Sequence, residues 1–200
     1  MSVSGTEIRV ALESIRRLHR QIALLLQSAD VYLTDSRGYA LASNVCRDYG
    51  SAIVDNPDEW MPNVVFRFYR PTSADAASTL TFISVILCPR FPESHAVTYT
   101  EPLVSAGWAR FESPPAFDAK RYFWASVITD APVPRDGTVF RSRGEGSKRC
   151  VEYGCFAVPL VQIAGTDDLV ARVLDPLCRL VSGSGQVTLD VSSSLPAEPG

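Results

Sequence analysis

The chain has 200 residues, of which 46% are hydrophobic and 20% are charged, so it can form a packed core and is not a wholly disordered chain. Nineteen basic residues against 22 acidic residues give a formal net charge of −3, which excludes a general electrostatic attraction to nucleic acid or anionic lipid. Its longest apolar runs, such as residues 82–88, fall far short of the about 20 residues that a membrane-spanning helix needs, and we expect a single domain over residues 1–181.

The first residues and the cysteines indicate the compartment. Residues 1–6 are small and polar, unlike the basic start and apolar core of a secretory signal, so we expect a cytoplasmic protein. The five cysteines are odd in number and scattered, and Cys150 and Cys155 lack the spacing of a C-x-x-C redox or zinc motif. We therefore expect reduced thiols, no metal site and no cofactor.

Residues 7–28 carry the clearest helical signal. Apolar side chains recur there at spacings of three and four, which predicts an amphipathic helix with one apolar stripe, and Thr6 is the candidate N-cap. The stripe consists of Ile8, Leu12, Ile15, Leu18, Ile22, Leu25 and Leu26. Because such a stripe needs a cover, we expect the helix to pack on the rest of the domain, on a protein partner or on a second copy of the chain.

The next segment, residues 30–44, predicts a hairpin. Two short apolar stretches flank the segment from Asp35 to Gly38, whose residue types favour a tight reversal of the chain. Over residues 15–44, the order of a helix and a hairpin with an aspartate-to-glycine turn resembles the opening of small sensory folds, the PAS, GAF and roadblock-like domains. The resemblance implies a small sheet domain that binds ligands or protein partners, and it assigns no functional residue.

The middle of the chain is dominated by β-strand signals. Branched, aromatic and alternating apolar residues predict strands at residues 64–70, 79–88, 96–100, 103–111, 122–129 and 152–163. The run at 79–88 fits a central strand covered on both faces, whereas Pro159 suggests an edge position or a bend in the last strand. Because strands and helices do not alternate, we expect an α+β fold, with an antiparallel sheet of about six to seven strands and the N-terminal and C-terminal helices packed on it.

A second helix is predicted to begin at Thr166, with acidic residues in its first turn that complement the helix dipole. Pro176 should kink or restart this helix, with Asp175 as the cap of the new turn. Small residues and prolines dominate residues 182–200, which we expect to form a flexible C-terminal tail.

Catalytic residue types are scarce. The chain has two histidines: His19 lies on the first predicted helix and His95 lies in a connecting loop. We predict no catalytic residue, but the open alternative is a small enzyme that uses His95 or Cys155 with nearby carboxylates.

The segment 135–149 is the best candidate for a binding surface. It holds three glycines and a local excess of basic residues, of which we single out Arg141, Arg143, Lys148 and Arg149. Guanidinium and ammonium groups could surround a phosphate or another anionic ligand there. The alternative is a solvated loop between strands.

These observations favour a non-catalytic sensory or protein-interaction module that forms a homo-oligomer or belongs to a larger assembly. Its expected contact surface is the helix at residues 7–28. The two alternatives are the small enzyme and a phosphate or nucleic-acid binder that acts through residues 135–149.

Overall fold

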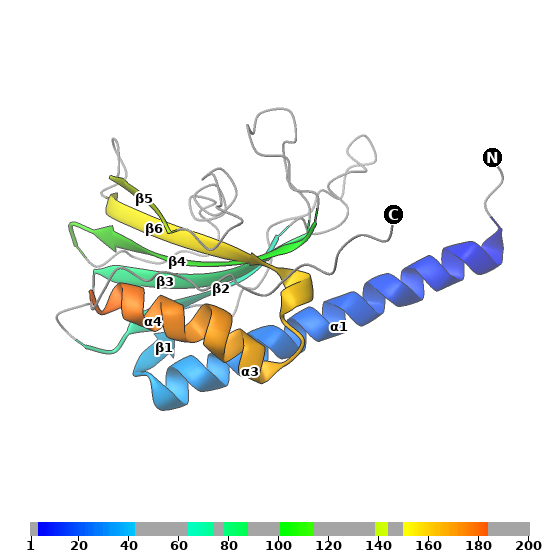
Figure 1. Cartoon of the computed structure of the whole chain (residues 1–200), viewed down its shortest axis with the longest axis horizontal. Coiled ribbons are helices and arrows are strands. Elements are labelled where there is room, and N and C mark those ends of the chain that lie inside the picture. The colour runs from blue at the N-terminus through cyan, green and yellow to red at the C-terminus, as the bar shows by residue number, and fades with distance from the viewer. Residues whose placement is uncertain are drawn as a thin grey trace, which may run out of the picture.

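The computed structural model describes residues 4–42, 64–73, 78–87, 101–113, 139–143 and 150–183. Within these ranges, six strands form one antiparallel sheet in the order β1-β2-β3-β4-β6-β5. The strands are β1 (Tyr39–Leu41), β2 (Val64–Pro71), β3 (Thr79–Ile86), β4 (Leu103–Phe111), β5 (Phe140–Arg143) and β6 (Cys150–Pro159). Helices from both ends of the chain lie along one face of this sheet (Figure 1), so the predicted α+β class with an antiparallel sheet is confirmed.

Strands β2, β3 and β4 lie where the apolar runs predicted them. Every residue of β3 is buried, which confirms a central strand covered on both faces. The predicted strands at residues 96–100 and 122–129 lie outside the described residues, as does most of the predicted tail, residues 184–200.

The last predicted strand and the loop before it need correction. Strand β6 ends at Pro159 opposite Leu103, and a short 3-10 turn, η3 (Leu160–Gln162), follows it. Strand β5 pairs with the outer side of β6 only from Glu152 to Cys155. Among the described residues no strand pairs with that side of β6 at Pro159, where the strand ends, so the edge position suggested for Pro159 agrees with the register. Residues 140–143 form β5, so the prediction of a loop over 135–149 was wrong for these four residues.

The first helix, α1 (Gly5–Ser36), begins earlier than predicted. The N-cap is Ser4, not Thr6: the Glu7 backbone N–H donates to Ser4 Oγ at 3.3 Å, and the Ser4 N–H donates to Glu7 Oε2 at 2.7 Å. This reciprocal pair is a capping box, which satisfies two N–H groups that would otherwise lack a partner at the helix start.

Helix α1 also ends later than predicted, so the hairpin expected over residues 30–44 was wrong. Ala29 and Leu33 extend the apolar spacing of the helix and are fully buried, and this burial outweighs the strand preference of the residues around them. The turn before β1 therefore joins a helix to a strand, and Gly38 supplies its left-handed φ of 70°.

The C-terminal helical segment runs through three consecutive parts: α3 (Thr166–Leu169), a π-helical turn η4 (Val170–Leu174) and α4 (Asp175–Val181). The backbone N–H of Asp175 bonds to the Val170 carbonyl five residues earlier. Pro176 has no N–H to donate, and this wider turn accommodates it without a break in the helix. Asp175 has helical φ and ψ of −65° and −46°, so its predicted role as a cap was wrong.

The principal core lies between the sheet and the two helical segments. It contains the inward side chains of α1, the apolar face of α3 to α4, and one face of the central strands; its large members include Leu26, Leu33, Tyr69, Ile83, Trp108, Phe156, Leu174 and Leu177. The opposite sheet face is buried too and is rich in phenylalanine, including Phe66, Phe68, Phe82 and Phe111.

Candidate interaction surface

Helix α1 divides into two halves that differ in their surroundings. The C-terminal half lies across the sheet beside α3, whereas the N-terminal half extends beyond the sheet (Figure 1). We call residues 5–21 the arm and the sheet with its packed helices the body. The residue after the arm, Ile22, is the first buried residue of the helix.

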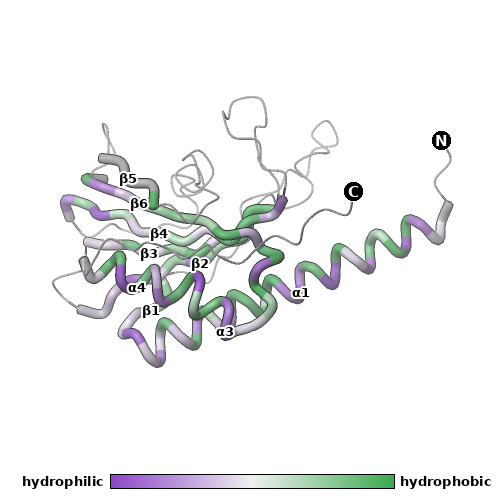
Figure 2. Tube along the Cα trace, viewed as in Figure 1, coloured by the Kyte–Doolittle hydropathy of each residue, from purple (hydrophilic) through white to green (hydrophobic). Residues whose placement is uncertain are grey.

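The arm carries the same apolar stripe as the half of α1 that packs on the body. Ile22 and Leu26 are 2% and 3% exposed, whereas Ile8 and Leu12 are 52% and 51% exposed. Every residue from 5 to 14 is exposed, and Figure 2 shows apolar and polar positions alternating along this part of α1. The sequence pattern therefore predicts a covered face, and the described residues cover only part of it.

The polar face of the arm is mainly basic. It carries Arg9, Arg16, Arg17 and Arg20 against two acids, Glu7 and Glu13. None of these arginines forms an ion pair with another described residue. The charges are segregated, since three of the four arginines follow the second glutamate along the helix.

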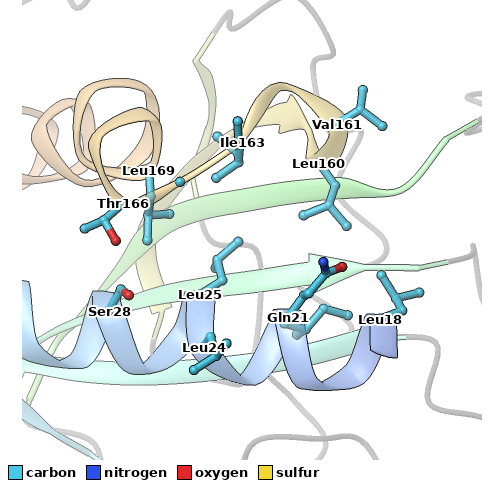
Figure 3. Close-up of a pocket in the computed structure, with 13 residues that line it drawn as sticks. Leu18, Gln21, Leu24, Leu25, Ser28, Leu160, Val161, Ile163, Thr166 and Leu169 are labelled. Carbon is cyan, nitrogen blue, oxygen red and sulfur yellow. The ribbon is translucent and has the colours of Figure 1, made fainter. Parts of the chain in front are cut away.

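An apolar groove begins where the arm meets the body. It has a volume of about 580 Å³ and lies between α1 and the segment that joins β6 to α3 (Figure 3). The groove is lined by Leu18, Gln21, Ile22, Leu24, Leu25 and Ser28 of α1 and by residues 160, 161, 163–166 and 169. Leu24 and Val161 in its walls are 62% and 77% exposed. The stripe and the groove thus form one continuous apolar surface.

Two polar clusters fix the body half of α1. In the first, the Tyr69 hydroxyl donates to Asp30 Oδ1 at 2.8 Å, and Arg67 Nε lies 3.4 Å from Asp30 Oδ2. Burial, and then the negative charge of Asp30, raise the pKa of Tyr69 well above its usual value. This cluster ties α1 to β2.

The second cluster ties the end of α1 to α4. Arg37 Nη2 lies 2.7 Å from Asp175 Oδ1, and the Tyr32 hydroxyl donates to the same carboxylate while it accepts from Arg37. A second hollow of about 830 Å³ lies beside Arg37 and Asp175. Because the charges of this pair are already matched to each other, we assign no ligand to this hollow.

The structure describes only half of the predicted anion site. Arg141 and Arg143 lie in β5, whereas Lys148 and Arg149 lie outside the described residues. The binding surface predicted from residues 135–149 therefore stays a prediction.

The candidate catalytic residues also gain no support. His95 lies outside the described residues. Cys155 is 1% exposed, and burial raises its pKa to about 12, so its thiol is enclosed and protonated at neutral pH. Nucleophilic attack requires an accessible thiolate, which Cys155 does not supply.

The part of the chain that the structure describes has no candidate metal site and no candidate membrane-spanning helix. No group of three or more His, Cys, Asp or Glu side chains among these residues could hold a metal ion. None of the described helices combines the length and the apolar character needed to cross a membrane.

Comparisons with known proteins give no relative. No protein-family model, no curated protein and no solved structure matches this chain.

Proposed function

We propose that this protein is a non-catalytic protein-interaction module that binds its partner through the arm and the adjoining groove. The observation that carries this proposal is the change in exposure along one stripe: Leu26 is 3% exposed and Leu12, on the same stripe, is 51% exposed. Burial of apolar surface contributes about 25 cal/mol per Å². The uncovered half of the stripe therefore offers a partner a favourable contact.

The start of the helix supports the same conclusion. The capping box at Ser4 and Glu7 fixes a definite helix start several turns before Ile22, the first buried residue. In proteins most helical stability comes from the packing of an amphipathic face, so binding would stabilise a capped arm whose apolar face is exposed. Amphipathic helices commonly bind partners through such a face.

The other functions predicted from the sequence receive less support. The enclosed thiol of Cys155 disfavours the enzyme that would use it. The resemblance to small sensory folds also implies a ligand-sensing role, in which a ligand would regulate the binding of the partner. This role stays a prediction.

Site-specific photocrosslinking tests the proposed function. The photoreactive residue p-benzoylphenylalanine would replace Leu12 in the full chain, produced in living cells that are then irradiated. Val31 is the matched control, because it lies on the same helix and is 61% exposed but points away from the core. We expect covalent protein adducts at position 12, and we expect Ile15→Glu to abolish them. Absence of adducts at position 12, or equal adducts at both positions, would refute the proposal.

A further inference from the structure

We propose that the partner of the arm is an acidic amphipathic helix of another protein, which packs its apolar face on the stripe and places a row of carboxylates beside the arginines of the arm. This inference rests on the proposed function, because it names the chemistry of the partner that the same surface binds. Two observations carry it: the basic residues next to the stripe lie on one side of it, and the body stands on the side toward which the stripe points.

The first observation concerns three arginines, which we call the arginine row. Arg9, Arg16 and Arg20 follow one another at spacings of seven and four residues, so at about 100° per residue they fall on one flank of the stripe. All three are exposed, and none forms an ion pair with another described residue. The opposite flank has no basic residue and consists of Glu7, Ser14 and Gln21.

The arginine row defines the charge of the partner. Guanidinium groups bind carboxylates through paired hydrogen bonds, and charges beside an apolar contact select the partner and accelerate association. The row spans about 17 Å at about 1.5 Å per residue, or about three helical turns, so carboxylates along one side of a partner helix can meet all of it. A second copy of the chain does not supply them, because two arms paired antiparallel would bring the two arginine rows together.

The groove indicates where the partner is uncharged. The described residues that line it carry no charged side chain, and it begins at Leu18, near the end of the arm. We therefore expect the partner helix to carry its carboxylates over the arm and to enter the groove with apolar side chains.

The second observation favours a helix over a lipid surface. Ile22 and Leu26 continue the line of the stripe and pack into the core, so the sheet lies on the side toward which the stripe of the arm points (Figure 1). A helix about 10–12 Å across fits on the arm beside the sheet, whereas a flat bilayer on the same stripe would meet the body. An anionic bilayer would also face both flanks alike, but the arginine row lies on one flank.

Charge reversal combined with photocrosslinking from position 12 of the full chain tests this inference. Arg16→Glu reverses the charge within the arginine row, and Arg17→Glu is the matched control. Both arginines are exposed and lie within about one turn of Glu13, but Arg17 lies on the back of the helix, opposite the stripe. We expect Arg16→Glu to lower the yield of protein adducts by about fivefold or more and Arg17→Glu to change it by less than about twofold.

Equal yields from the two variants would overturn the inference, while adducts at position 12 would leave the proposed function standing. No adducts at position 12, even in the chain with both arginines intact, would refute both. The two variants should have the same circular dichroism spectrum, since each places a glutamate near Glu13 and neither changes the core.

Two further measurements identify the occupant. Peptide mapping of the adducts should find a segment of another protein with carboxylates along one side of an apolar face; a segment without them, or one from a second copy of this chain, would overturn the inference. The purified chain should not co-sediment with vesicles made of equal parts of phosphatidylserine and phosphatidylcholine. Vesicle binding that Leu12→Glu abolishes would show that the arm binds a lipid surface and would also overturn it.

Discussion

The two halves of α1 carry the same apolar repeat, but one is covered by the molecule's own sheet and the other is not. The body half buries Ala29 and Leu33 completely and is fixed by the Asp30 and Asp175 clusters. The arm has a capped start and leaves Ile8 and Leu12 half exposed. The difference shows that the repeat specifies a face to be covered, whereas the rest of the fold decides how much of it remains for a partner.

The largest expected effect is a loss in the free energy of unfolding, compared between a leucine-to-alanine substitution in each half of α1. Leu33→Ala should lower the free energy of unfolding by about 2–5 kcal/mol, because it removes a fully buried side chain and leaves a cavity. Leu12→Ala should change it by no more than about 0.5 kcal/mol in the monomer. Urea denaturation at low protein concentration measures both values. Equal losses would mean that the arm is packed within the folded monomer, and the contrast between the halves would disappear.

A second substitution tests the part of the sheet that packs against the body half of α1. Trp108 belongs to the core cluster under the helices and lies over Gly154 of the neighbouring strand, where an added Cβ would come within 2.2 Å of the indole. Gly154→Ala should therefore displace Trp108 and cost about 1–3 kcal/mol of stability.

Tryptophan fluorescence and urea denaturation would report this change. The photocrosslinks from position 12 should persist below the unfolding transition, because Trp108 and Gly154 lie in strands β4 and β6, whereas the N-terminal half of α1 extends beyond the sheet. Unchanged stability would show that the sheet adapts to the extra methyl group.

The third prediction concerns the Asp30 cluster and alkaline pH. Burial and Asp30 raise the pKa of Tyr69 in the folded protein, whereas an unfolded tyrosine titrates near about 10. The folded state therefore holds the phenolic proton more tightly; this stabilisation is complete below pH of about 10 and is lost as the pH rises further. Tyr69→Phe should cost about 1–2 kcal/mol at neutral pH, through the lost hydrogen bond to Asp30, and should flatten the alkaline decline.

The measurement is the free energy of unfolding from neutral pH to the alkaline limit of reversible folding. Asp30→Asn serves as the comparison: it removes the charge but leaves Tyr69 buried, so its alkaline decline should lie between those of the wild type and Tyr69→Phe. An alkaline decline as steep in Tyr69→Phe as in the wild type would contradict this explanation.

How well the sequence predicts a feature of this structure depends on whether local residue spacing or tertiary packing determines that feature. Spacing predicted α1 and the central strands, since periodicity reports directly which face is buried. The end of α1 was missed because Val31 and Tyr32 favour strands locally, and only the packing of Leu33 against the sheet keeps them helical. Spacing also indicated the apolar face of the helix at 7–28 as a contact surface.

The groove was not predictable in the same way. Its second wall comes from residues 160–166, of which residues 160–163 were predicted to be part of a strand. Their position beside α1 results from the end of β6 at Pro159. Sequence spacing likewise could not tell which part of the apolar stripe the sheet would cover, because that depends on where α1 crosses it.

The smallest effect on overall stability is expected from a substitution at the N-cap of α1. This substitution gives the most direct comparison of the two halves of the helix. Ser4→Ala removes the hydroxyl that accepts from the Glu7 N–H, a loss of typically about 1 kcal/mol of helix stability. Because every residue from 5 to 14 is exposed, we expect this loss to appear as faster amide hydrogen exchange in the first turns of α1, with exchange around Leu33 and the global unfolding free energy unchanged. If the arm must be helical to bind, the same variant should weaken partner binding by about two- to fivefold. A variant that loses global stability instead would show that the start of α1 is coupled to the body, and unchanged exchange in the arm would show that a partner or another part of the chain already holds it.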